Sequence, residues 1–306
     1  MSKNVSWEGI YPAVLTPFTA DGAIDYDMFK KNFLAQVDAG VSGIIIAGTL
    51  GEASTLSTQE KHDLLAFAKE NLPAHISVLL NVAECTTQDA VEFAQKAESL
   101  GADGLMLLPP MRYKASDREV VAYFKAVANS TSLPILIYNN PVDYAIFVSV
   151  DMFAELQECA NIQAVKESTR DLTNITRMIN RFGDRFKILG GVDTISLESQ
   201  LAGASGSVAG LVDAFPRETM AIYHLAKVGR IEEAFAIYRW FMPLLELDIH
   251  PRLVQYIKLA AAAEGLSNEH VRAPRLPLEA EEKARIQQII DHARATRPTL
   301  PDYLNL

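Results

Sequence analysis

The chain has 306 residues, 49% of them hydrophobic and 22% charged, a composition typical of globular proteins, and its length permits either two domains or one large α/β barrel. The formal net charge is −10, from 28 Lys and Arg against 38 Asp and Glu, so we exclude nucleic acid and anionic membranes as partners, because both bind basic patches. A small anionic substrate is not excluded, since backbone N–H groups at the start of a helix can hold a carboxylate.

Short apolar runs rich in Val, Ile and Leu alternate with longer amphipathic stretches along the chain. Strands that are apolar nearly throughout and separated by helices are typical of a parallel sheet covered on both faces. Eight such units favour a closed (β/α)8 barrel, the TIM barrel, over an open sheet. The predicted strands are Ile10–Leu15, Gly43–Ala47, Ile76–Asn81, Gly104–Leu108, Ile135–Tyr138, Ile162–Lys166, Phe186–Leu189 and Gly206–Ala209.

The spacing of apolar residues between these strands predicts helices. Ser57 with Glu60 three residues later is a capping-box pattern, and Asp117 is a candidate cap for a later helix. Glycines at positions that suit a left-handed C-cap are Gly40, Gly101 and Gly183. The predicted helices are Tyr26–Ala39, Thr58–Asn71, Thr87–Leu100, Asp117–Asn129 and Leu172–Arg181.

The last strand is followed by more helical sequence than a barrel needs. Glu218–Val228 is the expected final barrel helix, and further helices are predicted over Ile231–Leu247, Leu253–Glu264 and Glu279–Ala295. No Gly/Ser-rich linker or charge run separates this region. We therefore expect residues 1–229 to form the barrel and residues 230–306 a C-terminal helical extension packed on it.

No apolar run is long enough to cross a bilayer, and the N-terminal stretch MSKNVSWEGIYPAV lacks the apolar core of a signal peptide. Cys85 and Cys159 lie far apart and at no metal-ligand spacing. Reduced thiols are the ordinary state of cysteine in cytosolic proteins. We expect a cytoplasmic protein with two free thiols.

In a barrel of this kind the active site lies at the C-terminal ends of the strands. The loop AGTLGEA, residues 47–53, follows the second strand, and its backbone N–H groups, with the hydroxyls of Thr49 and Ser54, can bind a carboxylate. Its spacing is not that of a dinucleotide or phosphate loop. Glycine is common in any such turn, and Glu52 also fits the acid that a helix dipole favours, so the loop alone leaves both interpretations open.

Two chemically active side chains end neighbouring strands. Burial of Lys166 would lower the pKa of its amine and leave a neutral nucleophile for a carbonyl, and the phenol of Tyr138 could relay protons beside it. The alternatives are a surface lysine paired with Glu167 or Asp171, and a core tyrosine whose hydroxyl bonds the backbone. The strand pattern alone leaves these alternatives open.

Small residues follow the last two strands, in GGVD at 190–193 and in GSVAG at 206–210. They leave room for a ligand beside the lysine, although they also suit tight turns. Histidines are scattered, mostly over helices, and none pairs at metal-ligand spacing, so we assign them no catalytic or metal-binding role. They are His62, His75, His224, His250, His270 and His292.

Four motifs occur in a fixed order: GTLGE at 48–52, IYNNP at 137–141, VKES at 165–168 and GGVD at 190–193. With these motifs, from YPAVLTPF at 11–18 to RLPL at 275–278, the chain resembles the dihydrodipicolinate synthase/N-acetylneuraminate lyase family of class I aldolases and lyases. Four motifs in order are far more specific than any one alone. The resemblance implies a barrel enzyme that is commonly a homodimer or a homotetramer.

The resemblance also implies roles for single residues. Lys166 stands at the position that forms the Schiff base, and Tyr138 at that of the phenol that shuttles protons. Thr49 belongs to the catalytic set and, with the loop amides, to the site of the substrate carboxylate. No metal or organic cofactor is implied, because the lysine imine itself is the electron sink. Further positions in the substrate pocket are Gly48, Leu50, Gly191 and Val208.

The chain departs from dihydrodipicolinate synthases at three positions. Leu50 replaces a second threonine, so we expect the hydroxyl relay from threonine to tyrosine to be cut. Asp143 replaces an arginine that binds the carboxylate of an aldehyde substrate, and an anion there should repel a dicarboxylate. Met111 replaces a tyrosine from the partner subunit, although Tyr113 lies two residues on. Lysine biosynthesis is therefore disfavoured.

Within the family, the opening residues, GTLGE and the segment MPLLELDIHPRLVQYIKL at 242–259 are most similar to Δ1-pyrroline-4-hydroxy-2-carboxylate deaminases of hydroxyproline breakdown. We expect deamination of that cyclic imine to 2,5-dioxopentanoate. Alternatives are a dihydrodipicolinate synthase-like reaction and an aldolase or dehydratase of 2-keto-3-deoxy sugar acids. A non-catalytic ligand-binding barrel is the alternative from another class, and a retained Lys166 with Tyr138 and Thr49 counts against it.

Overall fold

The computed structural model describes residues 5–306. Residues 1–4 lie outside the described part. They begin the stretch MSKNVSWEGIYPAV, which entered the predictions on a signal peptide and on the sub-group. Eight parallel strands alternate with helices in a TIM barrel, as the sequence predicts. No helix in the described part of the chain is long and apolar enough to cross a membrane.

The strands lie at the centre of the molecule and pair in parallel in the order β1-β8-β7-β6-β5-β4-β3-β2. The ring closes between β1 and β2, where the Ser42 amide donates to the Ile10 carbonyl and the Val14 amide donates to the Ile45 carbonyl, each at 3.0 Å. The strands are β1 Gly9–Pro12, β2 Gly43–Ile46, β3 Ser77–Val82, β4 Gly104–Leu107, β5 Ile135–Asn139, β6 Ile162–Glu167, β7 Lys187–Gly190 and β8 Gly206–Ala209.

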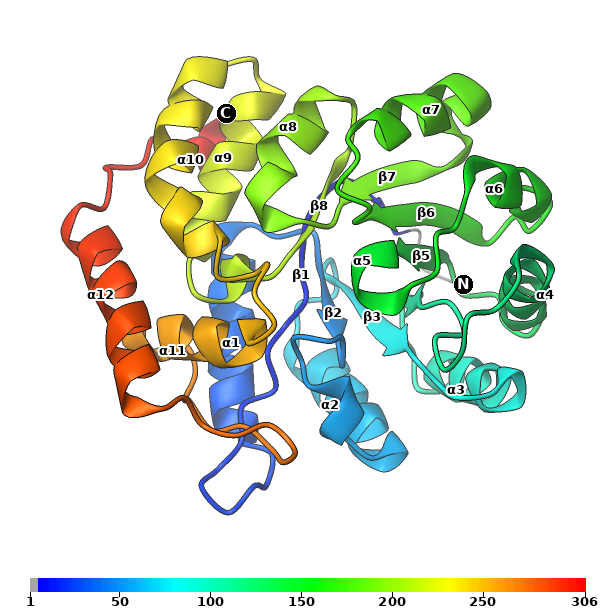
Figure 1. Ribbon diagram of the computed structural model, residues 1–306, viewed down its shortest axis with the longest axis horizontal. Helices are drawn as coiled ribbons and strands as arrows, with labels where there is room; N and C mark the ends of the chain where they lie inside the picture. Colours follow the sequence, from blue (N-terminus) through cyan, green and yellow to red (C-terminus); the bar gives the residue numbers. More distant parts are fainter. Residues whose placement is uncertain (1–4) are drawn as a thin grey trace.

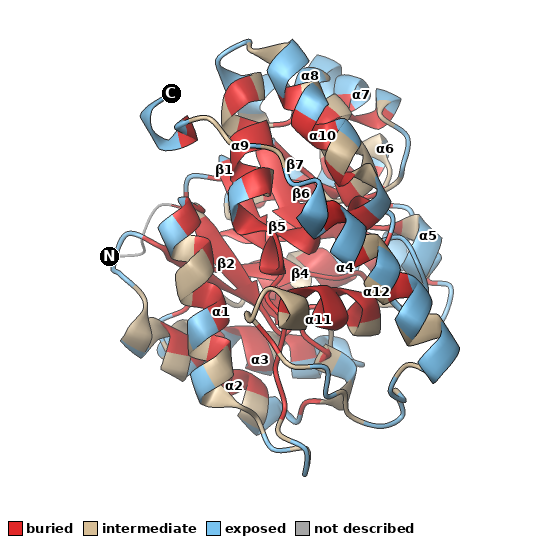
Figure 2. Ribbon diagram, turned by 90° about the vertical axis from the view of Figure 1, so that its left-hand side faces the viewer, coloured by how far each residue is buried: buried red, intermediate tan, exposed pale blue. Residues whose placement is uncertain are grey.

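Helices surround the barrel and turn their buried faces toward the strands (Figures 1 and 2). The longer ones are α1 Tyr26–Ala39, α2 Thr58–Asn71, α3 Thr87–Ser99, α4 Asp117–Ala128, α7 Thr173–Phe182 and α9 Pro216–Lys227. Three shorter helices did not stand out in the sequence: α5 Pro141–Tyr144, α6 Val150–Leu156 and α8 Ser196–Leu201. Short 3-10 helices are η1 Ala53–Thr55, η2 Gly183–Arg185, η3 Asp193–Ile195, η4 Leu211–Asp213 and η5 Tyr303–Asn305.

The capping signals explain where several helices begin and end. Ser57 and Glu60 form the predicted reciprocal capping box of α2, and Gly40 ends α1 with φ 98°. The prediction for Asp117 was wrong, because it is the first residue of α4 and Ser116 precedes it as the N-cap. Glu119 lies three residues after this serine and accepts a hydrogen bond from its amide at 2.8 Å.

Side chains alternate along each strand, so one set fills the barrel and the other packs under the helices. On β5 and β6 the inward positions are first Leu136 and Ala164, both fully buried, and then Tyr138 and Lys166. The apolar interior therefore changes to a polar end at the C-terminal edge of the strands, where the site lies.

The extension comprises α10 Ile231–Leu245, α11 Leu253–Ala263 and α12 Ala280–Ala295. Figure 1 shows these helices gathered on one side of the barrel, and α10 packs against α9. One apolar cluster joins the extension to the barrel, because it contains Leu15 and Phe215 together with Phe241 and Ile257. The division at residues 229 and 230 stays our proposal for the domain organisation.

Candidate active site

The pairing of β5 with β6 places a lysine beside a tyrosine. Tyr138 and Lys166 are register partners, and both point into the barrel. The amine Nζ of Lys166 lies 4.0 Å from the centre of the Tyr138 ring, and the lysine is only 7% exposed. The strand alternation therefore buries the one amine that sequence analysis selected.

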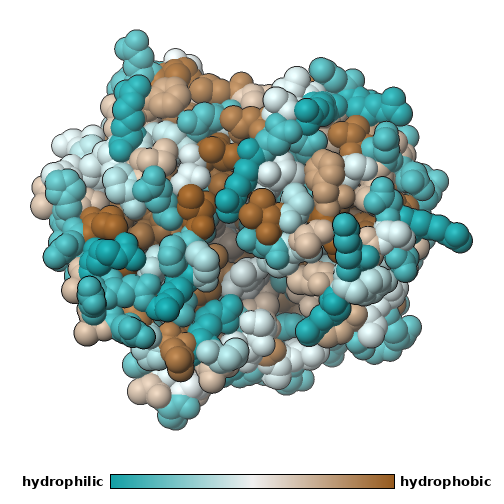
Figure 3. All heavy atoms as spheres, viewed as in Figure 1, coloured by the Kyte–Doolittle hydropathy of each residue, from teal (hydrophilic) through white to brown (hydrophobic). Residues whose placement is uncertain are grey.

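Lys166 lies in a cavity at the C-terminal end of the barrel, with about 660 Å³ of empty space that includes the solvent at its open mouth. Figure 3, seen from the side of Figure 1, shows the surface hollowed near the centre of this face. Eight of the site residues that the sequence predicts line this cavity: Gly48, Thr49, Leu50, Tyr138, Asp143, Lys166, Gly191 and Val208.

The surroundings of Lys166 exclude a surface ion pair. The carboxylate of Asp171 pairs with Arg177 at 2.8 Å, and that of Glu167 accepts a hydrogen bond from Asn174 at 2.6 Å. Burial lowers the pKa of Lys166, and nearby acidic groups, Asp248 first among them, oppose this shift. A larger fraction of the Lys166 amine is therefore neutral in this site than for a lysine in water at the same pH.

Gly191 makes room for the lysine side chain. A Cβ atom at this position would lie 2.6 Å from Lys166 Cγ and 2.1 Å from Ser168 Oγ. Ser168 is buried and donates a hydrogen bond to the Gly191 carbonyl at 3.0 Å. Any larger residue would displace the lysine side chain. Steric contact therefore explains why this position is a glycine.

The hydroxyl of Tyr138 has a side-chain partner instead of the backbone partner of a purely structural core tyrosine. It accepts a hydrogen bond from the Asn140 amide at 3.0 Å, and the same amide group donates to Asp143 at 2.7 Å. Burial raises the pKa of Tyr138, so the phenol holds its proton at neutral pH. The group can donate a proton inside the cavity.

Tyr144 lies at the end of α5 and is a site residue that no motif in the sequence marks. Its hydroxyl is hydrogen-bonded to Thr49 Oγ1, and its ring meets the Tyr138 ring edge to face, with the centres 5.5 Å apart. The expectation that Leu50 cuts the hydroxyl relay of the synthases stays a prediction, and this chain has a Thr49–Tyr144 pair beside that position. Leu50 itself is buried in the apolar cluster and forms part of the cavity wall.

The loop after β2 presents free donors. Within residues 5–306, the backbone amides of Thr49, Leu50 and Gly51 donate no hydrogen bond, whereas those of Glu52 and Ala53 donate to Thr49 and Gly48. Thr49 and Leu50 line the cavity, and backbone N–H groups left free in a cavity wall suit a carboxylate ligand. Ser54 does not contribute, because its hydroxyl accepts from Arg275 and lies in a neighbouring cavity.

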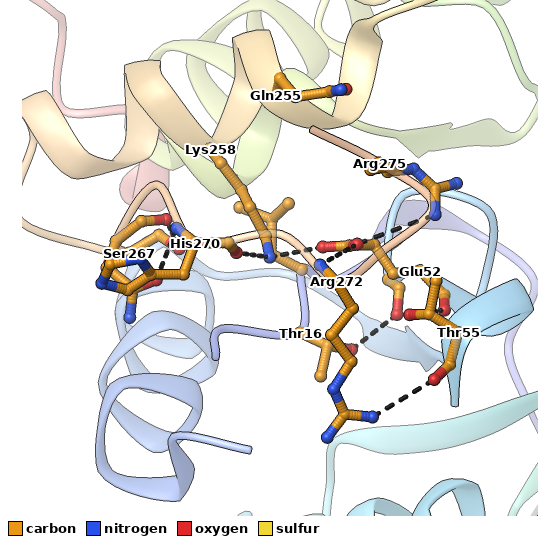
Figure 4. A network of polar contacts seen from close by, with 12 residues as sticks. Thr16, Glu52, Thr55, Gln255, Lys258, Ser267, His270, Arg272 and Arg275 are labelled. Atoms are coloured by element: carbon orange, nitrogen blue, oxygen red, sulfur yellow. Dashed lines mark hydrogen bonds and ion pairs between the residues drawn. The ribbon is translucent and has the colours of Figure 1, made fainter. Parts of the chain in front are cut away.

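Glu52 is not the exposed helix-dipole acid that the sequence also permitted. It is fully buried with φ 56°, and its carboxylate accepts from Lys258 Nζ at 2.5 Å (Figure 4). The same lysine donates to the His270 carbonyl at 2.6 Å, and the Arg272 amide donates to Glu52 at 3.3 Å. These contacts fix the loop to the C-terminal extension.

Two further charged residues line the cavity and were missed in the sequence. Asp248 lies in the turn after α10, and Arg170 lies four residues after Lys166, exposed at the mouth. Burial raises the pKa of Asp248 well above the usual range of an aspartate. No spacing rule links a single acid in the extension to a barrel strand, so only the fold could reveal it.

Other candidates lie away from Lys166. Met111 lines a neighbouring cavity with Tyr144, and Tyr113 is 58% exposed. None of the six histidines lines the cavity of Lys166. Residues 5–306 contain no group of three or more His, Cys, Asp or Glu side chains that could hold a metal ion.

Comparison with known families gives one match that spans most of the chain. The model of the "Dihydrodipicolinate synthetase family" matches residues 6–293. Curated relatives carry the name 4-hydroxy-tetrahydrodipicolinate synthase. That of Moorella thermoacetica is 31% identical over 282 residues, which cover 92% of this chain and 97% of the relative. That of Methanothrix thermoacetophila is 29% identical over 288 residues, with 93% and 96% covered.

Solved structures agree with these matches. A dihydrodipicolinate synthase of Bacillus anthracis superposes with a TM-score of 0.90 at 28% identity and covers 94% of this chain and 99% of its own. The dihydrodipicolinate synthase of Aquifex aeolicus superposes with a TM-score of 0.89 at 28% identity, with 94% and 98% covered.

Proposed function

The chain belongs to the dihydrodipicolinate synthetase family, and from this premise we propose that it is a Schiff-base enzyme that deaminates Δ1-pyrroline-4-hydroxy-2-carboxylate to 2,5-dioxopentanoate. The observation that carries the proposal is the buried amine of Lys166, which faces the same cavity as Tyr138, free loop amides and Asp143. This substrate has a single carboxylate for the site to bind and a single imine carbon for the lysine to attack.

In the proposed reaction Lys166 attacks C2 of the cyclic imine. The ring nitrogen leaves C2 and stays on C5 as an amine, which opens the ring by transimination. The substrate carboxylate binds the free amides of the loop after β2, beside Thr49. Burial of Lys166 supports this step, because a lowered pKa increases the fraction of neutral amine.

The protonated imine then acidifies the C3–H bond. Tyr138, which is protonated at neutral pH, takes this proton as it gives its own to the neutral amine freed on C5, and the resulting enamine expels the 4-hydroxyl group as water. Tautomerisation forms an enamine at C4–C5. Hydrolysis there releases ammonia, and hydrolysis of the lysine imine frees 2,5-dioxopentanoate, so one water is consumed overall. Proton transfer by a positioned side chain contributes about 10²–10⁴-fold in such steps.

Arg170 favours a second candidate, the reaction that gives the relatives their name. Among the described residues that line the cavity, Lys166 and Arg170 are the two with cationic side chains. Arg170 could therefore bind a second carboxylate at the mouth of the cavity. Asp143, whose carboxylate accepts from Asn140 in the same cavity, opposes a dicarboxylate at the position where the synthases have arginine. We therefore place this candidate second.

Product analysis separates the candidates. The purified protein is incubated with the hydroxypyrroline, with 2-keto-3-deoxy sugar acids, and with the substrates of 4-hydroxy-tetrahydrodipicolinate formation. The proposal expects ammonia and 2,5-dioxopentanoate from the first. Formation of 4-hydroxy-tetrahydrodipicolinate, or pyruvate from a sugar acid, without ammonia from the hydroxypyrroline would contradict it.

Asp143→Arg tests the pocket itself. If Asp143 determines which substrates fit at the end distant from the imine carbon, the variant loses turnover of the hydroxypyrroline. Circular dichroism then shows that the variant still folds. Unchanged turnover would contradict this account of the cavity. The same proposal includes a cytoplasmic location, no metal or organic cofactor, and a homodimeric or homotetrameric assembly.

A further inference from the structure

We propose that Asp248, a residue of the C-terminal extension, is the general acid that protonates the departing 4-hydroxyl group. This inference rests on the proposed function and adds a catalytic residue to it. In this division of roles Tyr138 transfers the proton at C3. Asp248 protonates the hydroxyl group on C4 and later takes up the proton that C5 loses.

The fold brings Asp248 into the cavity of Lys166 from far along the chain. The residue lies in the turn between α10 and α11, and the side chain lines the cavity together with Tyr138, Asp143 and Lys166. The absence of a side chain at Gly210 permits this approach, because a Cβ atom there would lie 2.5 Å from Asp248 Oδ1. Asp248 is therefore built into the cavity wall.

The groups around Asp248 favour its protonated form. Lys166 faces it from β6, Asp193 from the segment after β7, and Asp143 from α5. Burial and the two other carboxyl groups raise its pKa, whereas Lys166 and a backbone hydrogen bond from Asp193 oppose the shift. A carboxylic acid kept neutral in this way can donate a proton at neutral pH.

Asp193 is a poor alternative because its carboxylate is already engaged. It accepts hydrogen bonds from the amides of Gly210 at 3.2 Å and of Leu211 at 2.7 Å. Asp143 accepts a side-chain bond from Asn140. Asp248 accepts from one backbone amide, that of Asp193, and from no side-chain donor within residues 5–306, so its carboxyl group is less engaged than that of Asp193 and can still bind a ligand.

The step balances without any further reagent. The enamine electrons form a C3–C4 double bond as the C4–O bond breaks, and the leaving oxygen takes the proton of Asp248 and departs as water. The Asp248 carboxylate regains a proton when C5 loses one in the following tautomerisation. C3 is reprotonated from the side of Tyr138.

The test compares Asp248→Asn with Glu246→Gln, a control that removes an exposed carboxylate two residues away in the same turn. Ammonia release from the hydroxypyrroline should fall at least about 10²-fold in Asp248→Asn and stay at the wild-type rate in the control. Borohydride trapping with pyruvate, which has no 4-hydroxyl group, should still label Lys166. That labelling shows that the variant folds, and Asp248→Ser replaces Asp248→Asn if it does not.

The mass of the trapped adduct identifies the blocked step. With the hydroxypyrroline, Asp248→Asn should accumulate an adduct that retains the hydroxyl group and is heavier by one water than the dehydrated adduct. Wild-type ammonia release, or a dehydrated adduct, in Asp248→Asn would overturn the inference alone. Absence of ammonia from the wild type would instead refute the proposed function, and the inference would fall with it.

Discussion

The amine of Lys166 lies over the ring of Tyr138, with the next charged groups at the cavity wall and not in direct contact. Its chemistry therefore depends on burial more than on any single partner. The same holds for Tyr138 and Asp248, whose pKa values burial raises. One cavity thus combines an amine that loses its proton readily with acids that retain theirs, a distribution that suits imine chemistry.

The lowered pKa of Lys166 predicts the pH dependence of adduct formation. The neutral amine attacks, so the rate of borohydride-dependent inactivation with pyruvate should rise with pH. It should reach its plateau below the usual lysine pKa of about 10.5. A plateau only above the usual lysine value would contradict the burial argument.

The Thr49–Tyr144 pair predicts a second effect at the residue scale. Tyr144→Phe removes the hydroxyl that bonds Thr49, and we expect turnover to fall by roughly 10-fold or more, because a proton path is lost. Tyr113→Phe is the matched control, since that side chain is exposed and lies two residues from the synthases' partner-tyrosine position. Steady-state rates over a range of pH distinguish the variants. If Tyr113→Phe is impaired and Tyr144→Phe is not, the tyrosine acts across subunits instead.

At the scale of elements, the buried contact of Lys258 with Glu52 joins α11 to the loop after β2 (Figure 4). Both side chains are 0% exposed, and the loop carries the free amides of the site. Glu52 adopts a left-handed conformation that is unfavourable for a residue with a side chain. The ion pair therefore holds a strained turn in place beside the cavity.

Removal of one partner should be costly. Lys258→Met leaves Glu52 without its closest cation, and we expect the free energy of unfolding to fall by about 3–5 kcal/mol. Lys258→Met with Glu52→Gln should be less destabilised than Lys258→Met alone. Arg230→Ala breaks a solvent-exposed pair with Glu233 and should cost about 0–1 kcal/mol. Urea unfolding measures all three variants, and equal losses for Lys258 and Arg230 would refute this account.

The same lysine makes a pH-dependent contribution to stability. Burial lowers the pKa of Lys258 to about 8 in the folded chain. The pKa of a lysine in the unfolded chain is about 10.5. Between about pH 8 and pH 10.5 the unfolded chain therefore binds more protons at this residue than the folded chain does. The free energy of unfolding should rise with pH in that window. Lys258→Met should lack this component of the rise.

The strands and most helices were predictable because their signals are local. Apolar runs gave all eight strands, and β8 agrees at both ends. Helices α5, α6 and α8 were missed because they are too short for helical periodicity. Asn140 and Pro141 did carry a signal for α5, since an Asn N-cap before a proline is typical of a helix start, and that turn brings Tyr144 to Thr49.

At the scale of the whole molecule, the site draws on both the barrel and the extension. Motif order in the sequence selected Lys166 and Tyr138, a departure from the synthases selected Asp143, and the fold brings all three into one cavity. It could not select Asp248, because nothing in a single acidic residue of a helical turn indicates proximity to a strand about eighty residues earlier. The segment around it showed only an overall likeness in sequence.

Lys166 is the residue that forms an imine with a 2-oxo acid or its cyclic imine in the proposed reaction. The most direct measurement is incubation with pyruvate or the hydroxypyrroline in the presence of borohydride, followed by peptide mass mapping. We predict one adduct, on the peptide that contains Lys166, and none in Lys166→Ala, whereas Lys187→Ala on the neighbouring strand still forms it. No adduct with either compound, or one that persists in Lys166→Ala, would contradict the account.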